Sequence, residues 1–429
     1  MTDTKNQPPT LLTCFLGCRL NQAENRKIEK QLLAAGFAPY QENNPPTVII
    51  LNTCLVTQKA EKETRQTIRR LKRDFPQSFL VVTGCAATGV KKLGLKLPAA
   101  DWIIPNSQKE TIATRLIKKF SPKPAKKILP APLRAYVKIQ EGCHQFCTFC
   151  LTAYVRGPEK SQPPEKVIKE IKELSSQGTK EVILTGVNLS FYGRDLSPQT
   201  NLTELLPLLL KKTSMPRLSL SSLTPNIIDK KLANIFIRDW GGEKRLSYFF
   251  HIALQSGSSR ILSLMNRPKT NLKKLERTIQ YIKEEIPIFN IRADIIVGFP
   301  EETEEDFEQT LHYTKSLRIA FGHIFRYSPR PGTVAFEKIK NGSWQPIPEN
   351  IKKERAQKVR QLIAQIQKEE AEKLKGQKLL SLVTHQKENY SFALTNNFWR
   401  VKIKKLIPVG EIIPVKITNF YHSSLEGKA

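Results

Sequence analysis

Short apolar runs alternate with amphipathic stretches along the first 120 residues. The runs LLTCFLG, TVIILNT, FLVVTG and DWII are typical of buried strands, and residues 19–36, 57–74 and 107–120 have the period of helices. This βαβα order predicts a doubly wound parallel sheet over residues 1–120. The proline-rich stretch SPKPAKKILPAP, residues 121–132, predicts an extended linker and a domain boundary.

The alternation resumes after the linker and predicts a second α/β domain over residues 133–347. Helical stretches separate most of its strand candidates, which are AYVKIQ, EVILTG, RLSLSS, YFFHIAL, IRADIIVGF and FGHIFRY. Six βα units in a row predict a barrel-like sheet that stops short of eight strands. In such sheets the chemistry lies in the loops that follow the strands.

The last part of the chain changes its period. Residues 348–373 predict one amphipathic connecting helix, and residues 374–429 alternate with period two, as in LLSLVTH and IIPVKITNF. We therefore expect a small C-terminal β-barrel. Its aromatic residues Phe398, Trp399 and Tyr421 suit either base stacking or a hydrophobic core.

Composition indicates a polyanionic partner and a reducing compartment. The net charge is +30, and the basic residues come in runs such as RRLKR and KPAKK, which favours nucleic acid. The polar start MTDTKNQPPT and the lack of a long apolar run predict a cytoplasmic protein without a membrane segment. There, seven cysteines suit ligands or reactive thiols better than disulfides.

Three of these cysteines stand in the stretch EGCHQFCTFC, directly after the first strand of the second domain. Cys143, Cys147 and Cys150 have the spacing C-x3-C-x2-C. Thiolates favour an iron–sulfur cluster or zinc, and three ligands leave one position of a four-iron cluster open. A zinc site would recruit His144, which is adjacent to Cys143 and can hardly turn toward the same centre.

This loop, with Phe149 before its last cysteine and a six-unit βα domain around it, resembles the radical S-adenosylmethionine superfamily. The resemblance implies that the open iron is chelated by S-adenosylmethionine. It also implies that an electron from the cluster cleaves this cofactor to methionine and a 5′-deoxyadenosyl radical, which abstracts hydrogen from an unreactive carbon.

Cys18, Cys54 and Cys85 each follow a predicted parallel strand, so the fold would gather them at one edge of the first sheet. Three small buried residues are the alternative. The order LGCRLNQAE, LNTCLVTQKAEKETRQTIRRL, VVTGC, VKIQEGCHQFCTFC, VRG, LTGVN, LSSLTP, HIALQSG, MNRP, DIIVGFPEETEEDF and YSPRPGT resembles the methylthiotransferases along nearly the whole chain.

That resemblance implies two [4Fe-4S] clusters. Cys18, Cys54 and Cys85 would hold the auxiliary cluster, and Cys143, Cys147 and Cys150 the radical cluster. It also implies an N-terminal methylthiotransferase domain, a radical domain and a TRAM-like RNA-binding β-domain. Cys14 has no counterpart and is interpreted as a buried hydrophobe. Ala153 stands where the family usually has proline, which affects the expected substrate contacts of that loop.

Polar and glycine residues at strand ends are the candidates for S-adenosylmethionine contacts. Glycines permit close backbone approach, and short polar side chains could bind ribose or adenine edges. Each could instead be a turn residue or strand cap. Thr303 to Asp306 suits a helix N-terminus and is assigned no chemistry. The candidate contacts are Thr185, Gly186, Asn188, Ser221, Ser222, Gln255 and Gly298.

The function that the resemblance to the methylthiotransferases implies is methylthiolation of carbon 2 of N6-threonylcarbamoyladenosine beside the anticodon of tRNA, with two S-adenosylmethionines used. The stretches VKIQEGCHQFC, EVILTGVNLSFYG and HIFRYSPRPGT most resemble that branch. The alternatives are N6-isopentenyladenosine in tRNA, an aspartate of a ribosomal protein, and a non-catalytic zinc-containing RNA-binding protein. We expect a monomer that binds the tRNA anticodon stem-loop; the sulfur and electron donors do not follow from the sequence.

Overall fold

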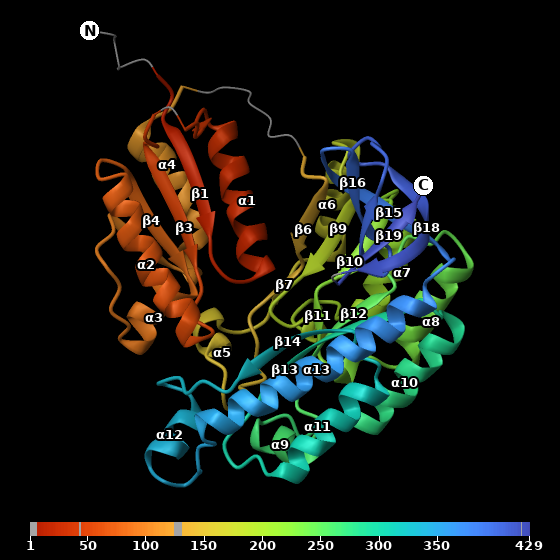
Figure 1. Cartoon of the computed structure of the whole chain (residues 1–429). Helices are drawn as coiled ribbons and strands as arrows, with labels where there is room; N and C mark the ends of the chain where they lie inside the picture. Colours follow the sequence, from red (N-terminus) through yellow and green to blue (C-terminus); the bar gives the residue numbers. More distant parts are fainter. Residues whose placement is uncertain (1–6, 43, 124–130, 422) are drawn as a thin grey trace. The chain divides into compact units, whose positions relative to one another are not determined.

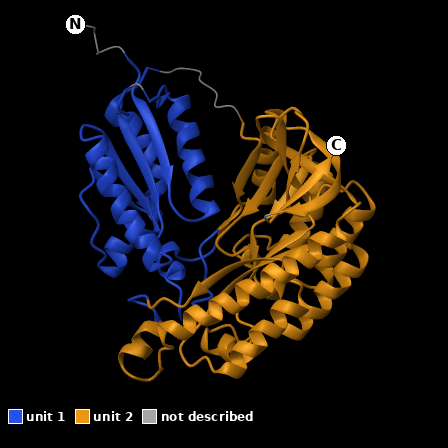
Figure 2. Ribbon diagram, viewed as in Figure 1, with its two compact units in different colours: residues 1–130, 141–159, 330–333 blue, residues 131–140, 160–329, 334–429 orange. Residues whose placement is uncertain are grey.

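The computed structural model describes residues 7–42, 44–123, 131–421 and 423–429 of the 429-residue chain. These fall into two compact units (Figure 2). Unit 1 comprises residues 1–130, 141–159 and 330–333, and unit 2 comprises residues 131–140, 160–329 and 334–429. Most of the expected linker over residues 121–132 lies outside the described residues. Within the described ranges, no helix has the length and apolar character needed to cross a membrane.

Unit 1 contains a sheet of parallel strands in the order β2-β1-β3-β4-β5. Its central strand β3 (Val48–Thr53) is buried throughout, and its side chains alternate between two apolar clusters. One cluster includes Ile28 of α1 and Leu116 of α4, and the other includes Ile68 of α2. Helices therefore cover both faces of the sheet (Figure 1), which confirms the predicted doubly wound arrangement.

The predicted strands and helices of this sheet are all present, although the helix expected over residues 107–120 begins as a 3₁₀ turn, Asn106–Thr111. The remaining elements of unit 1 are β1 (Thr10–Phe15), α1 (Arg19–Ala34), β2 (Ala38–Pro39), α2 (Gln58–Asp74), β4 (Phe79–Gly84), α3 (Cys85–Leu93), β5 (Trp102–Pro105), α4 (Ile112–Phe120) and α5 (Thr152–Arg156).

Unit 2 contains six parallel βα units, as the sequence predicts, but its strands form two sheets. One sheet has the order β10-β9-β6 and the other β11-β12-β13-β14. The stretch RLSLSS, expected as one strand, is interrupted at Ser221, so that β10 pairs with β9 and β11 pairs with β12. The strands are β6 (Arg134–Lys138), β9 (Glu181–Thr185), β10 (Arg217–Leu220), β11 (Ser222–Leu223), β12 (Phe249–Gln255), β13 (Asn290–Val297) and β14 (Phe321–Arg326).

Helices follow these strands, as expected for βα units. The helix α11 begins with a capping box, in which the side chains of Thr303 and Asp306 each accept a backbone N–H of the other residue. This confirms the structural role expected for the acidic stretch there. The helices and two short strands are β7 (Gln140–Glu141), β8 (Lys160–Ser161), α6 (Pro164–Ser176), α7 (Leu202–Lys212), α8 (Lys230–Gly241), α9 (Ser259–Leu264), α10 (Leu272–Glu285), α11 (Glu304–Ser316), α12 (Val334–Lys340) and α13 (Glu349–Lys373).

The C-terminal strands close into the small barrel that the period-two pattern predicts, in the order β15-β16-β17-β19-β18. Buried Arg217 of β10 attaches it to the parallel sheets, because its guanidinium donates to the backbone oxygens of Leu380 and Leu394. A backbone hydrogen bond from Tyr248 to Asn396 adds to this contact. The barrel strands are β15 (Lys378–Lys387), β16 (Tyr390–Thr395), β17 (Arg400–Ile403), β18 (Ile412–Tyr421) and β19 (Ser424–Lys428).

Candidate metal centres and ligand sites

Three cysteines gather at the carboxyl edge of the sheet in unit 1. Cys18 follows β1, Cys54 follows β3, and Cys85 follows β4 as the first residue of α3. β1 lies between β2 and β3, so the strand order reverses there, and open α/β sheets bind ligands outside the strands at such a switch point. The sequence predicts the strand ends, but only the strand order reveals that Cys18 and Cys54 flank the switch.

The loop after β1 is tightly fitted against Cys54. Gly17 has a φ of +86°, and a Cβ at that position would lie 2.7 Å from the Cys54 Sγ. Only glycine fits both the backbone conformation and this close approach. The glycine of LGC therefore allows the loop that carries Cys18 to approach Cys54.

The thiols of this set influence one another. Burial, followed by the charge of Cys85, raises the pKa of the Cys54 thiol to about 11. Burial also raises the pKa of Cys18, although the positive charge of Arg156 opposes it. Thiols bind metal as thiolates, so a metal that binds here must displace protons. Two thiols with raised pKa values, which interact electrostatically with a third at Cys85, suit a shared metal centre, whose positive charge removes their mutual repulsion.

A buried ion network lies beside these cysteines. The Arg156 guanidinium donates to Glu24 at 2.7 Å, to Asn21 at 2.6 Å and to Glu141 at 3.1 Å. Lys109 donates to the second oxygen of Glu24 at 2.5 Å. Exposed fractions of the side chains of Arg156, Glu24 and Lys109 are 1%, 3% and 6%. Two buried cations thus share one fully buried carboxylate, while Glu141 is partly exposed.

The cations of this network favour negative charge on the thiols, whereas Glu24 opposes it at Cys18. Burial opposes ionisation of Arg156, but the charges of Cys85 and Glu24 offset it and hold the arginine pKa above its usual value. Burial lowers the pKa of Lys109, and Glu24 opposes that shift. Neither Arg156 nor Lys109 was a candidate from the sequence. The motifs NQAE and VRG contain Glu24 and Arg156, but nothing in their spacing predicts that they meet.

The second cysteine set lies in the loop before α5 and also belongs to unit 1. The backbone N–H groups of Gln145 and Thr152 donate to the Sγ atoms of Cys143 and Cys150, at 3.4 and 3.3 Å. Cys150 and Cys147 are joined by a backbone hydrogen bond of 2.9 Å. N–H donors to sulfur stabilise thiolates and the sulfurs of iron–sulfur clusters.

His144 is engaged elsewhere. Its backbone N–H donates to Glu159 at 2.9 Å, and its Nδ1 contacts the other oxygen of the same carboxylate. In the part of the chain that the structure describes, this loop therefore offers three cysteines without a local fourth ligand. Both cysteine sets fit a four-iron cluster with one open position better than a closed zinc site, which takes four protein ligands.

One apolar cluster connects the surroundings of both cysteine sets. Leu55, next to Cys54, and Leu151, next to Cys150, belong to it together with Cys85 and Val155. Cys14 lies apart from both sets and packs, partly buried, against the cluster that contains Leu51. Its apolar surroundings agree with its interpretation as a hydrophobe, although its burial is incomplete.

The candidate contacts for S-adenosylmethionine lie at the carboxyl ends of the strands of unit 2. Ser221 and Ser222 stand where β10 ends and β11 begins, and the hydroxyl oxygens of both are buried without a hydrogen-bond partner among the described residues. An unpaired buried hydroxyl costs roughly 1–3 kcal/mol, so native proteins rarely leave one without a purpose. These two hydroxyls fit a site for a polar ligand.

The stretch around Gly186 is shaped by its neighbours. A Cβ on Gly186 would lie 2.9 Å from the Oε1 of Gln140, and the same oxygen accepts the backbone N–H of Asn188 at 2.9 Å. The Asn188 side chain accepts the N–H of Ser190, which caps a short 3₁₀ turn. Thr185 is buried at the end of β9. These contacts orient the loop but do not by themselves indicate a ligand.

The ends of β12 and β13 show two further departures from regular backbone. Gln255 has a φ of 71°, a left-handed conformation that glutamine seldom adopts and that is frequent at functional sites. Gly298, at 67°, is explained by packing instead, because a Cβ there would lie 2.3 Å from the Lys352 side chain. Its backbone N–H donates to Glu302 at 2.6 Å.

Two polar residues at the end of β14 were missed by the sequence analysis. The hydroxyls of Tyr327 and Ser328 are buried and, within the described ranges, have no hydrogen-bond partner. Burial raises the pKa of Tyr327 to about 12, so that this phenol stays neutral. Both belong to the motif YSPRPGT. Two hydroxyl side chains at the end of a predicted strand were the sequence feature that could have identified them as candidates.

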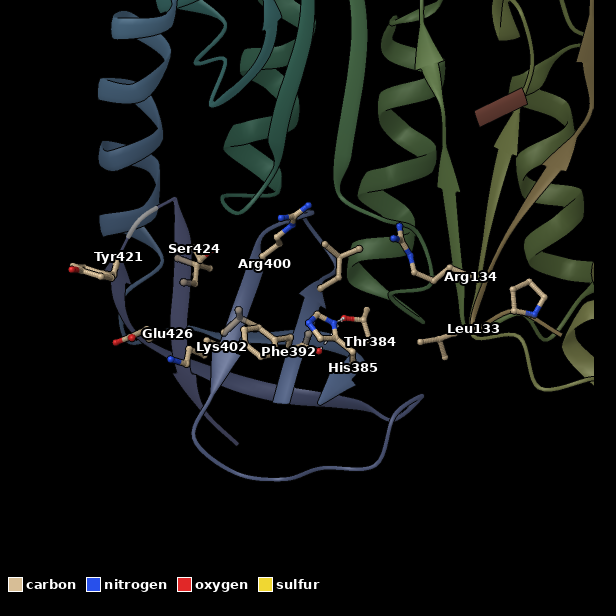
Figure 3. A pocket seen from close by; sticks show the side chains of 15 residues that line it. Leu133, Arg134, Thr384, His385, Phe392, Arg400, Lys402, Tyr421, Ser424 and Glu426 are labelled. Atoms are coloured by element: carbon tan, nitrogen blue, oxygen red, sulfur yellow. Dashed lines mark hydrogen bonds between the residues drawn. The ribbon is translucent and has the colours of Figure 1, made fainter. Parts of the chain in front are cut away.

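The small barrel carries a cavity of about 1000 Å³ with basic and aromatic lining (Figure 3). The rings of His385 and Phe392 stack with centroids 4.6 Å apart, and Arg400 and Lys402 project from the neighbouring strand β17. Stacked rings beside cations are typical of surfaces that bind single-stranded nucleic acid. This makes the cavity a candidate RNA interface.

The aromatic residues named from the sequence mostly belong to the core instead. Trp399 and Phe398 are 1% and 8% exposed, and they pack against Phe321 and Phe249 of the parallel sheet. Tyr421, at 62%, is the exposed one of the three and lines the cavity. A period-two pattern does not distinguish a ring that faces the interior of a small barrel from one that faces solvent.

Comparison with known proteins identifies relatives of both units. Residues 137–314 match the radical SAM superfamily, and residues 10–104 match "Uncharacterized protein family UPF0004". Threonylcarbamoyladenosine tRNA methylthiotransferase MtaB of Aquifex aeolicus is 34% identical over 94% of this chain and 98% of its own length. The enzyme of the same name from Rickettsia prowazekii is 32% identical over 94% of this chain and 93% of its own.

A second kind of relative matches equally well in identity. The tRNA-2-methylthio-N(6)-dimethylallyladenosine synthase of Thermodesulfovibrio yellowstonii is 34% identical, with 96% of each chain covered. Among solved structures, the radical S-adenosylmethionine methyltransferase TsrM of Kitasatospora setae has a TM-score of 0.52 at 14% identity, with 78% of each chain covered. That likeness concerns the fold.

Replacing Glu24 tests the buried ion network. Glu24→Gln leaves Arg156 and Lys109 buried without their shared charge, and we expect it to lower the free energy of unfolding of unit 1 by about 3–5 kcal/mol. Hydrogen exchange of the β1–β4 peptides measures this change. The matched control is Glu110→Gln, which removes an exposed ion pair with Lys27 and should leave exchange unchanged. If hydrogen exchange were equally fast in Glu24→Gln and Glu110→Gln, the buried ion network would not stabilise unit 1.

Proposed function

This chain belongs to the radical S-adenosylmethionine methylthiotransferases, and we propose that it attaches a methylthio group to carbon 2 of N6-threonylcarbamoyladenosine beside the anticodon of tRNA. The observation that carries the proposal is the 34% identity, over 98% of its length, to the Aquifex aeolicus enzyme named for that nucleoside. As a member of the family, the chain is a transferase that uses a [4Fe-4S] cluster and S-adenosylmethionine.

In this proposal each cysteine set holds one cluster. Cys143, Cys147 and Cys150 are the ligands of the radical cluster, and Cys18, Cys54 and Cys85 those of an auxiliary [4Fe-4S] cluster. When bound, the radical cluster supplies the electron that cleaves S-adenosylmethionine to the 5′-deoxyadenosyl radical. The N–H groups that donate to Cys143 and Cys150, and the cations beside Cys18 and Cys85, support thiolate ligands at both places.

The strand ends of unit 2 are the proposed binding place of S-adenosylmethionine. Ser221 and Ser222 would supply hydroxyls to its polar groups, because both are buried and lack a hydrogen-bond partner among the described residues. Gln255 presents its strained backbone at the same edge. The other proposed contacts are Thr185, Gly186, Asn188 and Gly298.

Nucleic acid fits the charge of the chain and the surface of the small barrel. A net charge of +30 favours a polyanionic substrate, and Arg400 and Lys402 flank the stacked rings of the cavity. We propose that this TRAM-like barrel contacts the tRNA outside the modified nucleoside. We further propose a cytoplasmic monomer, since its substrate is cytoplasmic and no part of the proposed chemistry needs a second copy.

The isopentenyl nucleoside is the second candidate substrate. The Thermodesulfovibrio yellowstonii relative, named for the dimethylallyl form, reaches the same 34% identity. The stretches VKIQEGCHQFC, EVILTGVNLSFYG and HIFRYSPRPGT favour the threonylcarbamoyl branch. The two nucleosides differ only in the group on N6, so the choice between them depends on the part of the binding site that contacts this group.

The nucleosides of tRNA test the substrate directly. In cells without this gene, we expect the 2-methylthio form of N6-threonylcarbamoyladenosine to disappear and its unmethylthiolated precursor to accumulate, as measured by mass spectrometry of digested tRNA. Reintroducing the gene should restore the mark, and a Cys147→Ala copy should not. A mark on isopentenyladenosine instead would favour the second candidate, and unchanged tRNA would direct attention to a ribosomal-protein aspartate.

Iron content tests the two cysteine sets. Anaerobically purified protein should be brown with about eight irons, and Cys54→Ala should lose about half of them. Cys14→Ala is the matched control, because Cys14 lies on the same sheet but outside the proposed set, and it should keep all its iron. Colourless wild-type protein with stoichiometric zinc would instead support the non-catalytic alternative.

Measuring cofactor cleavage and RNA binding in the same variant distinguishes the role of the radical cluster from that of the RNA-binding surface. With a chemical reductant, Cys147→Ala should form no 5′-deoxyadenosine above background, because the proposed radical cluster loses one of its three ligands. Its affinity for the tRNA anticodon stem-loop should match the wild type. Lost RNA binding with cleavage intact would overturn the assignment of this loop.

A further inference from the structure

Three side chains of the motifs HIALQSG, DIIVGFP and HIFRY meet in unit 2, and the proposed function gives none of them a role. They stand on the adjacent strands β12, β13 and β14. The Nε2 of His251 lies 2.8 Å from the Oδ1 of Asp294, and the Nδ1 of His323 lies 3.0 Å from the same oxygen. The two imidazole rings are 5.3 Å apart. One carboxylate oxygen therefore joins both histidines.

This cluster lies on the face of the sheet opposite α13. Gly322 of β14 faces α13, because a Cβ there would lie 2.5 Å from the Ile363 side chain. Alternate residues of a strand point to opposite faces, so His323 and Phe325 face away from the helix, toward the concave side of the partial barrel. The side chains of His251, Asp294 and His323 are 11%, 20% and 50% exposed, which makes His323 the accessible end.

Asp294 fixes the orientation of His323. Burial opposes ionisation of Asp294, but the hydrogen bonds from His251 and His323 lower its pKa to about 2, so it is a carboxylate at neutral pH. A carboxylate accepts, so the Nδ1 of His323 carries the proton that it shares with Asp294. The Nε2 is then left to accept a hydrogen bond, and no hydrogen bond to it is seen in the ranges that the structure describes.

The cluster is bordered by an exposed aromatic ring on one side and a cation on the other. Phe325, two residues toward the end of β14, is 42% exposed, and its ring lies near that of His323. Arg292, two residues before Asp294, lies over the rings of Phe249 and Phe321 at 5.5 and 5.6 Å. Two residues of a strand span about 7 Å, so the ring of Phe325, the imidazole of His323 and the guanidinium of Arg292 follow one another along the strands at that interval.

We propose that His323, oriented by Asp294, together with Arg292 forms a subsite for a polar, carboxylate-bearing group on N6 of the substrate adenosine, while the exposed ring of Phe325 stacks on the base. This inference rests on the proposed function and names the part of unit 2 that selects the substrate. The threonylcarbamoyl group has the matching chemistry, since its hydroxyl and N–H groups donate and its carboxylate pairs with a cation.

The dimensions fit this group. From N6 to its carboxylate the threonylcarbamoyl chain extends roughly 6 Å. This is close to the distance of about 7 Å between residues i and i+2 of a strand. An isopentenyl group has a similar length but no polar atom, and it would bury the Nε2 of His323 without giving it a hydrogen bond. A site that is built for hydrogen bonds rejects an analogue that lacks them for this reason.

A metal is the other ligand that two imidazoles and a carboxylate could bind. The observations favour the nucleoside subsite, because both histidines already satisfy the same carboxylate oxygen and because an exposed aromatic ring stands directly beside them. The metal is an outcome of the test below.

The test is binding to anticodon stem-loops that differ only in the N6 group. Fluorescence anisotropy with the cluster-loaded enzyme, under anaerobic conditions and without reductant, gives Kd values for loops with threonylcarbamoyladenosine, isopentenyladenosine or adenosine. The wild type should prefer the first by at least about tenfold. His323→Phe should lose about tenfold for that loop alone, and Asp294→Asn should behave similarly because His323 is no longer oriented.

The matched control is His312→Phe on α11, which lies outside the cluster and should keep the wild-type preference. If the wild type prefers threonylcarbamoyladenosine and both His323→Phe and Asp294→Asn keep that preference, the subsite is overturned while the proposed function stands. If the wild type prefers the isopentenyl loop, the proposed branch itself fails. Zinc or iron that resists chelation and is lost in His323→Phe would assign the cluster to a metal and also overturn the subsite.

Discussion

The ion pair between Arg156 and Glu24 is the contact on which the surroundings of both cysteine sets depend. The stretch from Gly142 to Arg156 has little regular structure of its own, and α5 is a single short helix. Arg156 attaches the end of this stretch to α1, while Leu151 and Val155 pack beside Leu55 and Cys85. A loop that carries three of the cysteines thereby gains a fixed position on the sheet that carries three others.

The sequence predicts most of this sheet because its strands β3 and β4 are buried on both faces and its helices have apolar stripes. It also predicts that Cys18, Cys54 and Cys85 stand at strand ends. Lys109 and Arg156 escape prediction for a physical reason: a lone basic residue in a polar stretch resembles any solvated one, and only the packing of α1, the 3₁₀ turn and α5 buries its charge. The sequence already disfavours zinc because His144 is adjacent to Cys143, and the contact of His144 with Glu159 adds a second reason that only the structure provides.

In unit 2, periodicity identifies the parallel strands but misses the break between β10 and β11. Both halves of RLSLSS satisfy the strand pattern, and the change of partner at Ser221 depends on how the sheet curves. Beside that break, the buried hydroxyls of Ser221 and Ser222 have no hydrogen-bond partner among the residues that the structure describes. The feature that the pattern could not reveal is therefore the best sign of a ligand. Trp399 and Phe398 show the opposite case, in which plausible RNA contacts are core residues.

The division of the chain into units has a consequence for its synthesis on the ribosome. Unit 1 takes its last pieces from residues 141–159 and 330–333, and Arg330 in the second piece donates to Glu61 and to the Leu55 backbone. When the first 130 residues have emerged, Glu24 and Lys109 still await Arg156. At roughly 5–20 residues per second, the roughly 200 residues from residue 130 to residue 333 take about 10–40 s to synthesise, so unit 1 is completed well after its sheet has been translated. A fragment cut at the linker would therefore lack Arg156 and Arg330, and with them the ion pairs that Glu24 and Glu61 form within unit 1.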